Sequence, residues 1–278
     1  LLYFASSFTG ITGVEKPWRT IIWESEKELI ESIKSYKTLS NSVSHARVLL
    51  IGPVGEGKSS FFNSINSVFR GHVTYIHKYY TSFIYYNYLT ATLCHSSCDT
   101  MGLETVQAEG LNLDDISNVI NGHIPDHYQF NPSVPLQPED QRFRKNPELK
   151  DKIHSSDFLF CFVFISLYLN FCLLLYLFIV LLLGIPQLVL LTKVDEACPL
   201  VKEDIKNIYK STSIKKIAAT RIGVSLSCVV LVKNYSEELE LETNIDILLL
   251  SAVIQMLRFV DNYFDEISDP MSSAAIKD

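Results

Sequence analysis

Hydrophobic positions along the chain follow two alternating patterns. Short runs of apolar and branched residues predict buried strands over residues 46–51, 158–165, 188–191 and 225–232. Between these runs, apolar residues recur at helical spacing, which predicts helices over residues 24–36, 60–70, 113–121, 201–221 and 245–267. Because strands alternate with helices, we expect a mostly parallel central sheet covered by helices on both faces, an α/β three-layer sandwich.

We divide the chain into a leader and helix over residues 1–40 and a main domain over residues 41–278. Two parts of the main domain are atypical. Residues 73–97 are rich in tyrosine, and residues 158–183 carry no charged side chain. The chain begins at Leu1 without a methionine, so we treat it as a fragment or as an imperfect gene model.

The composition restricts the class of protein. Hydrophobic residues make up 47% and charged residues 20% of the chain, which excludes a disordered or low-complexity protein. The net charge of −7 argues against a broad nucleic-acid-binding surface, so we expect no nucleic-acid partner. The six cysteines form no C-x-x-C pair, and we therefore expect reduced, buried thiols and a cytoplasmic location.

A glycine-rich motif follows the first predicted strand. The pattern Gly52-x-x-x-x-Gly57-Lys58-Ser59 matches a phosphate-binding P-loop, and a predicted helix follows it, as that motif requires. Glycines allow backbone N–H groups to surround a phosphate, the lysine adds a positive charge, and the serine hydroxyl can ligate Mg²⁺. We predict a phosphate site formed by Gly52, Gly55, Gly57, Lys58, Ser59 and Ser60.

A second short motif, Asp99-Thr100-Met101-Gly102, has the form D-x-x-G. In GTPases the aspartate of this motif reaches Mg²⁺ through water, and the glycine N–H senses the γ-phosphate. We predict that Ser59 and Asp99 hold Mg²⁺ and that Gly102 contacts the γ-phosphate. A surface turn is the alternative interpretation of so short a motif.

The third motif, Thr192-Lys193-Val194-Asp195, follows the strand predicted at residues 188–191 and has the form [NT]-K-x-D. A carboxylate can accept two hydrogen bonds from guanine N1–H and N2–H₂, and adenine offers no equivalent pair. We therefore predict that Asp195 reads guanine, that the stem of Lys193 lies along the base, and that the ligand is GTP or GDP with Mg²⁺. A last base-contacting loop is expected at Lys233-Asn234, on a weaker signal.

With these motifs in order, the chain resembles the interferon-induced protein 44 family, including its 44-like members. The similarity covers residues 46–73, 98–152, 184–210 and 232–265. The similar sequence segments include ARVLLIGPVGEGKSSFFNSINSVFRGHV, CDTMGLE and GIPQLVLLTKVDEACPLVKEDIKNIYK. The resemblance implies a cytoplasmic, GTPase-like protein that is induced by interferon and takes part in antiviral and immune responses. It does not imply that GTP is turned over.

Several positions depart from the pattern of an active GTPase. Leu103 follows Gly102 where Ras-like enzymes carry a glutamine that orients the attacking water. We therefore expect hydrolysis to be slow, or to depend on a partner or on assembly, and we assign no catalytic residue. Glu56 lies inside the P-loop, where we expect its side chain to point outward because a phosphate would repel it. The switch threonine has three candidates: Thr81, Thr90 and Thr92.

The uncharged run at residues 158–183 has three interpretations. Its length suffices to cross a bilayer, so a membrane segment is one of them. The others are a core strand followed by an unusually apolar helix, and non-coding sequence carried into the gene model, which we favour. A membrane span would separate the P-loop from Asp195 and destroy the nucleotide site, so attachment to a membrane is the least favoured interpretation.

Three functional hypotheses result from the sequence. The first is a guanine-nucleotide-binding, GTPase-like protein of the interferon-induced response, with self-assembly or protein partners in addition to the nucleotide. The second is a non-hydrolysing scaffold that keeps the fold and has a degenerate nucleotide site. The third is a protein anchored to a membrane through residues 158–183.

Overall fold

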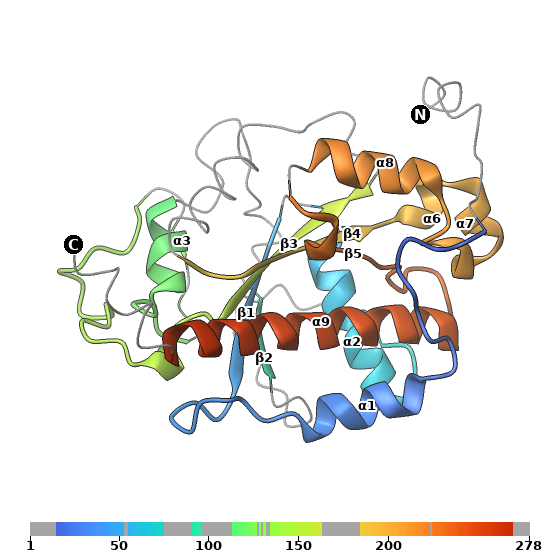
Figure 1. The fold of residues 1–278 in the computed structure, drawn as a ribbon. Coiled ribbons are helices and arrows are strands. Elements are labelled where there is room, and N and C mark those ends of the chain that lie inside the picture. The colour runs from blue at the N-terminus through green and yellow to red at the C-terminus, as the bar shows by residue number, and fades with distance from the viewer. Residues whose placement is uncertain are drawn as a thin grey trace.

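A parallel sheet lies at the centre of the structure (Figure 1). The computed structural model describes residues 15–52, 55–74, 91–95, 113–126, 128, 130–131, 134–162, 184–222 and 224–268. Within them, the strands form one parallel sheet in the order β2-β1-β3-β4-β5. These strands are β1 (Ala46–Ile51), β2 (Ala91–His95), β3 (Ser155–Cys161), β4 (Gln187–Thr192) and β5 (Val229–Leu231). The predicted α/β class with a parallel sheet is confirmed.

Helices cover both faces of this sheet (Figure 1). One face carries α1 (Glu26–Ser35), α2 (Lys58–Arg70) and α9 (Thr243–Ser268). The other carries α3 (Leu113–Ile120) and α8 (Thr212–Arg221). Two short helices, α6 (Val194–Ala197) and α7 (Pro199–Glu203), follow β4, and 3₁₀ turns occupy Leu149–Asp151, Ile205–Asn207 and Leu226–Cys228. The three-layer arrangement agrees with the prediction.

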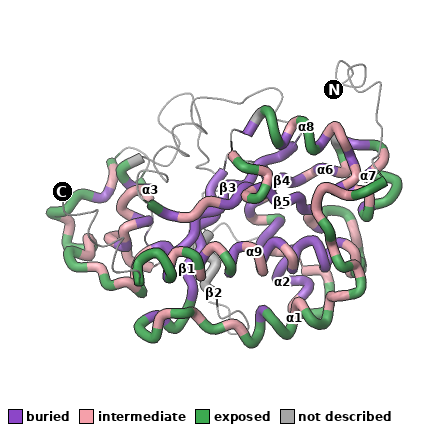
Figure 2. Tube along the Cα trace, viewed as in Figure 1, coloured by how far each residue is buried: buried purple, intermediate pink, exposed green. Residues whose placement is uncertain are grey.

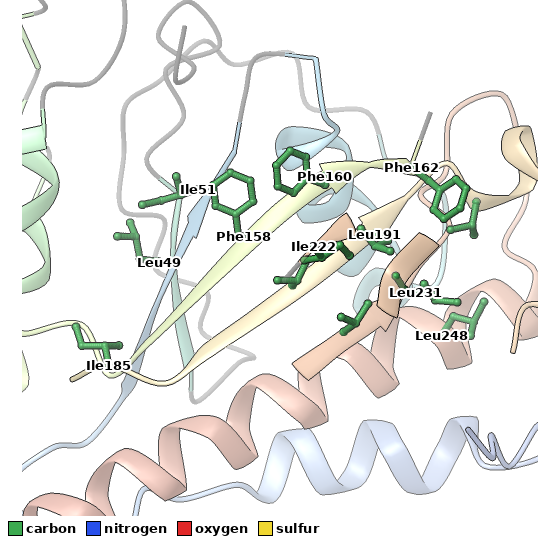
Figure 3. Packing of buried hydrophobic residues seen from close by; sticks show 14 of the residues in the cluster. Leu49, Ile51, Phe158, Phe160, Phe162, Ile185, Leu191, Ile222, Leu231 and Leu248 are labelled. Carbon is green, nitrogen blue, oxygen red and sulfur yellow. The ribbon is translucent and has the colours of Figure 1, made fainter. Parts of the chain in front are cut away.

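Successive strand residues pack into two hydrophobic cores, one on each face of the sheet. Phe158 and Phe160 of β3 pack with Leu191 of β4 in the core that α3 and α8 cover (Figure 3). Leu159 and Leu190 pack in the opposite core, with α2 and α9. Strands β1 and β3 are therefore buried along their whole length (Figure 2). This double burial explains why β1 and the second half of β3 are marked in the sequence by continuous apolar runs rather than by alternating ones.

The region around β1 and α2 follows the predicted boundaries closely. Strand β1 has the predicted bounds, and α2 ends at Arg70, immediately before Gly71. Gly71 has a φ of 74°, and its N–H donates to the carbonyl oxygens of Ser67 and Val68. Glycine is favoured in this left-handed conformation because it has no Cβ, and it therefore ends the helix.

The single helix predicted over residues 201–221 is wrong. The chain forms α7, then a 3₁₀ turn, then α8. The Asp204 carboxylate accepts a hydrogen bond from the N–H of Lys206 at 2.9 Å. The Ser211 hydroxyl oxygen accepts one from the N–H of Ile214 at 3.3 Å. Short polar side chains of this kind begin new helical turns, so they divide the segment despite its helical spacing.

Two strand boundaries also differ from the prediction. Strand β3 begins at Ser155, because its polar first half pairs in register with β1, from Val48 opposite Ser155, and it ends at Cys161. Residues 163–165 of the predicted strand lie outside the described residues. Strand β5 is limited to Val229–Leu231, because Ser225 caps a 3₁₀ turn just before it. The helix that we expect after β3, over residues 166–183, lies outside the described residues.

By length and composition, α9 is the one described helix that could cross a membrane. However, 61% of its most apolar window is buried inside the protein, against the sheet, α1 and α2. Core helices of water-soluble proteins meet the same criterion, so this is weak evidence for a membrane span. The run on which the membrane hypothesis depends lies outside the described residues after Phe162.

Arg19, in the segment before α1, is bound to the far edge of the described sheet. Its guanidinium donates to the carbonyl oxygens of Val229 at 2.6 Å and Leu226 at 2.8 Å. The same group lies 5.7 Å from the ring centre of Trp18 and 5.5 Å from that of Tyr209. Arg19 therefore joins the N-terminal segment to the start of β5, where backbone carbonyls would otherwise need other donors.

Replacing Arg19 with alanine is expected to lower the free energy of unfolding by about 2–3 kcal/mol, because charged hydrogen bonds and cation–π contacts are lost together. Urea unfolding measures the change. Arg142→Ala is the control, because Arg142 is largely exposed and pairs with Asp140 at the surface. A loss for Arg19→Ala no larger than that for the control would contradict the assigned role.

Candidate nucleotide-binding site

The glycine-rich loop joins the carboxyl end of β1 to the start of α2. A Cβ atom at Gly52 would lie 2.2 Å from the carbonyl oxygen of Leu159 in β3, so a side chain would be excluded there. Lys58 begins α2 and is buried, and its Nζ donates to the carbonyl oxygen of Gly52 at 2.8 Å. The ammonium group of Lys58, at the end of the loop, therefore binds the backbone of Gly52, at its start.

The conformation of this loop suits a phosphate group. Gly57, the residue before α2, has a φ of 97° and offers no side chain to cap the helix. Gly55 has a φ of 81°, and among the described residues no atom lies within 4 Å of the place where its Cβ would be. Ser59 and Ser60 lie in the first turn of α2, where backbone N–H groups and the helix dipole favour an anion. The donor set thus fits the predicted phosphate.

The glycine-rich loop, the T-K-V-D motif and the segment after β5 come together in the structure. The Thr192 hydroxyl donates to the carbonyl oxygen of Glu56 at 2.9 Å, with Phe160 O as the alternative acceptor at 3.2 Å. The Asn234 amide donates to the carbonyl oxygen of Gly57 at 3.1 Å. The loop therefore meets two segments that lie more than a hundred residues later in the chain, at the carboxyl ends of β1, β4 and β5, where parallel α/β sheets bind ligands.

Charged side chains gather beside the end of β4. Lys193 has a φ of 55°, the single left-handed residue other than glycine in the described part of the chain. Lys233 Nζ lies 3.8 Å from Asp195 Oδ2 and 3.0 Å from Glu238 Oε1. Burial lowers the pKa of Lys233, but its hydrogen bond to Glu238 and the charge of Asp195 raise this pKa above its usual value. Lys233 therefore stays charged and can orient the partly exposed carboxylate of Asp195.

The outward orientation expected for Glu56 is wrong. The side chain is buried beneath the loop, and its carboxylate accepts a hydrogen bond from the N–H of Cys161 at the end of β3. Burial raises the pKa of Glu56 to about 7, although the N–H of Cys161 and the charges of Lys58 and Lys193 act to lower it. The sequence contains no signal for this arrangement, because it depends on how closely β3 approaches the loop.

The D-x-x-G motif lies outside the described residues. This applies to Asp99, Gly102 and Leu103, and to the candidate switch residues Thr81 and Thr90, whereas Thr92 belongs to β2. Ser59 is thus the described member of the predicted Mg²⁺ pair. In the parts of the chain that the structure describes, no three His, Cys, Asp or Glu side chains gather to form a metal site.

Comparisons with known proteins identify homologues of the chain. It is 35% identical over 268 residues to human "Interferon-induced protein 44-like", in an alignment that covers 88% of the chain. It is 33% identical over 261 residues to "Interferon-induced protein 44" of Pan troglodytes, and 32% identical over 256 residues to that of Mus musculus. The chain is a homologue of the interferon-induced protein 44 family. The resemblance seen in the sequence is therefore confirmed.

The chain spans less than two thirds of the length of these interferon-induced protein 44 relatives, namely 58%, 59% and 60% of the three. No protein-family model matches the chain. The relatives are interferon-induced by name, and their names state no ligand or reaction.

Proposed function

We propose that this protein binds a guanine nucleotide with Mg²⁺ at the P-loop edge of its sheet. The observation that carries this proposal is the meeting of three segments: Thr192 donates to Glu56 O, and Asn234 donates to Gly57 O. In the proposed complex, Lys58 and the first turn of α2 bind the phosphates. The bound Mg²⁺ would neutralise phosphate charge, with ligands from Ser59 and, through water, Asp99.

The specificity for guanine is assigned to Asp195. Its carboxylate lies beside Lys233 and is partly exposed, so the hydrogen-bond donors of a ligand can reach it. Lys233 is held between Asp195 and Glu238, which restricts the direction of the Asp195 side chain. Thr192, in the position that often holds asparagine, uses its hydroxyl to bind the P-loop backbone.

We propose that this activity serves the antiviral and immune response in the cytoplasm. The names of the relatives support one part of this setting, which is induction by interferon. Because Leu103 replaces a water-orienting glutamine, hydrolysis is proposed to be slow or to require a partner or assembly. A scaffold that binds nucleotide without hydrolysing it satisfies the same observations.

The test is the preference of the protein for GDP over ADP and its dependence on Asp195. Asp195→Ala is expected to weaken GDP binding by about 100- to 1,000-fold, since two charge-assisted hydrogen bonds are lost, and to leave ADP binding nearly unchanged. Competition against a fluorescent GDP analogue measures both affinities. Glu196→Ala, on the next residue of α6, is the matched control. Equal affinity of the wild type for GDP and ADP would refute the assignment.

A further inference from the structure

Glu56 occupies an unusual place for an acidic residue. It lies between two glycines of the P-loop and is 5% exposed. Its carboxylate accepts a hydrogen bond from the backbone N–H of Cys161, which pairs with Thr192 across β3 and β4. The side chain therefore reaches under the loop to the central strand of the sheet.

The same residue is also held through its backbone. Its carbonyl oxygen accepts from the Thr192 hydroxyl, and the next carbonyl, that of Gly57, accepts from the Asn234 amide. Glu56 and its neighbour are thus bound to the ends of β3 and β4 and to the segment after β5. These contacts hold the loop in one conformation before any ligand arrives, and such preorganisation lowers the cost of binding.

A buried carboxylate beneath a phosphate-binding loop has an electrostatic consequence. Phosphate groups bound in the loop would lie close to this acidic group and would disfavour its ionised form. Building on the nucleotide binding proposed above, we propose that Glu56 is a positioning residue that anchors the P-loop to β3, and that phosphate binding there is linked to the uptake of one proton from solvent by its carboxylate.

The surroundings of Glu56 allow this protonation near neutral pH. Within the described part of the chain, the charged groups that face it are Lys58, in α2, and Lys193, after β4, while β3 contributes the N–H of Cys161. Both lysines and the N–H favour the carboxylate, but burial outweighs them and raises the pKa to about 7. Bound phosphate raises this pKa further, through the part of its negative charge that Mg²⁺ does not neutralise. By reciprocity, a protonated Glu56 must increase the affinity for phosphate.

The experiment is a calorimetric titration of GDP into the protein from about pH 6 to about pH 8.5, in two buffers of different ionisation enthalpy. For the wild type, we expect the Kd to rise about tenfold with pH and proton uptake to accompany binding. Glu56→Gln keeps an acceptor for the N–H of Cys161 but cannot ionise, so its Kd should follow only the titration of GDP itself. Glu56→Ala should bind more weakly than Glu56→Gln at every pH, because both lack the charge and only the alanine variant lacks the anchor.

The controls separate this linkage from the nucleotide site itself. Glu203→Gln changes an exposed acid on α7 and should behave as the wild type. If GDP binds with no proton uptake, and if its affinity changes with pH equally for the wild type and Glu56→Gln, the role of Glu56 is overturned and the nucleotide site is left intact. Absence of GDP binding at every pH would overturn both proposals. Proton uptake is measured on the wild type itself, so its absence would overturn the linkage even if the variants folded poorly.

Discussion

Replacing Lys58 with alanine is expected to weaken the binding of GDP and of ADP alike, by roughly 1,000-fold. The lysine ammonium is buried and already lies 2.8 Å from the carbonyl oxygen of Gly52, so it is held inside the loop that would surround the phosphates. The loss corresponds to about 4 kcal/mol, the value of two charge-assisted hydrogen bonds to phosphate oxygens. The affinities for the two nucleotides should fall equally, because Lys58 would contact the phosphates and not the base.

The measurement is a titration of each nucleotide, together with thermal unfolding of the ligand-free protein. Lys58→Met is a useful second variant, because it keeps an apolar stem in the buried position while it removes the charge. Lys215→Ala on α8 is the control, since this lysine is exposed and remote in sequence from the P-loop. If Lys58→Met folds like the wild type and binds GDP with unchanged affinity, the phosphate role of the loop is refuted.

The parts of the fold that sequence reasoning predicted well are those whose signals are local. Strand β1 is an uninterrupted apolar run, and α2 ends at a glycine that adopts a positive φ. The meeting of the P-loop with Thr192 was also predictable, because the carboxyl ends of parallel strands lie at one edge of the sheet. The placement of Asp99 and Gly102 at that edge stays a prediction.

Two of the failures share a physical cause, which is that tertiary burial overrides the local sequence pattern, and the third results from local helix caps. Ser155 and Asp157 appear too polar for a strand, yet both are fully buried in β3 between β1 and β4. The helical spacing over residues 201–221 did not reveal the caps at Asp204 and Ser211. The inward side chain of Glu56 depends on the N–H of Cys161, about a hundred residues later in the chain, which no local rule connects to it.

The buried acid of β3 gives a further prediction of large effect. Asp157 is wholly buried, accepts a hydrogen bond from the Ser155 hydroxyl at 3.1 Å, and has no partner for its other carboxyl oxygen among the described residues. Burial raises its pKa to about 8, against a smaller lowering by Ser155. The group is therefore protonated in the folded protein at neutral pH, whereas an unfolded chain carries it ionised, with a pKa of 3.8.

This difference makes stability depend on pH. Because the folded pKa is raised, the contribution of Asp157 is complete below about pH 4 and is lost as the pH rises toward 8, by about 1.4 kcal/mol per pH unit. Asp157→Asn removes the ionisation and fills nearly the same volume. We expect the variant to exceed the wild type in free energy of unfolding by about 4 kcal/mol at pH 7, and the excess to shrink as the pH falls.

Urea unfolding of both proteins between about pH 4.5 and pH 8 measures this excess directly, because every other titrating group is common to the two. Asp140→Asn is the control with the opposite sign: Arg142 lowers the pKa of that exposed carboxylate to about 2, so its stabilisation is complete above pH 4 and is lost only as the pH falls toward 2. Its effect should therefore stay constant over the measured range. An excess for Asp157→Asn that does not change with pH would show that Asp157 is ionised within the folded sheet, and that β3 contains a buried charge rather than a buried carboxylic acid.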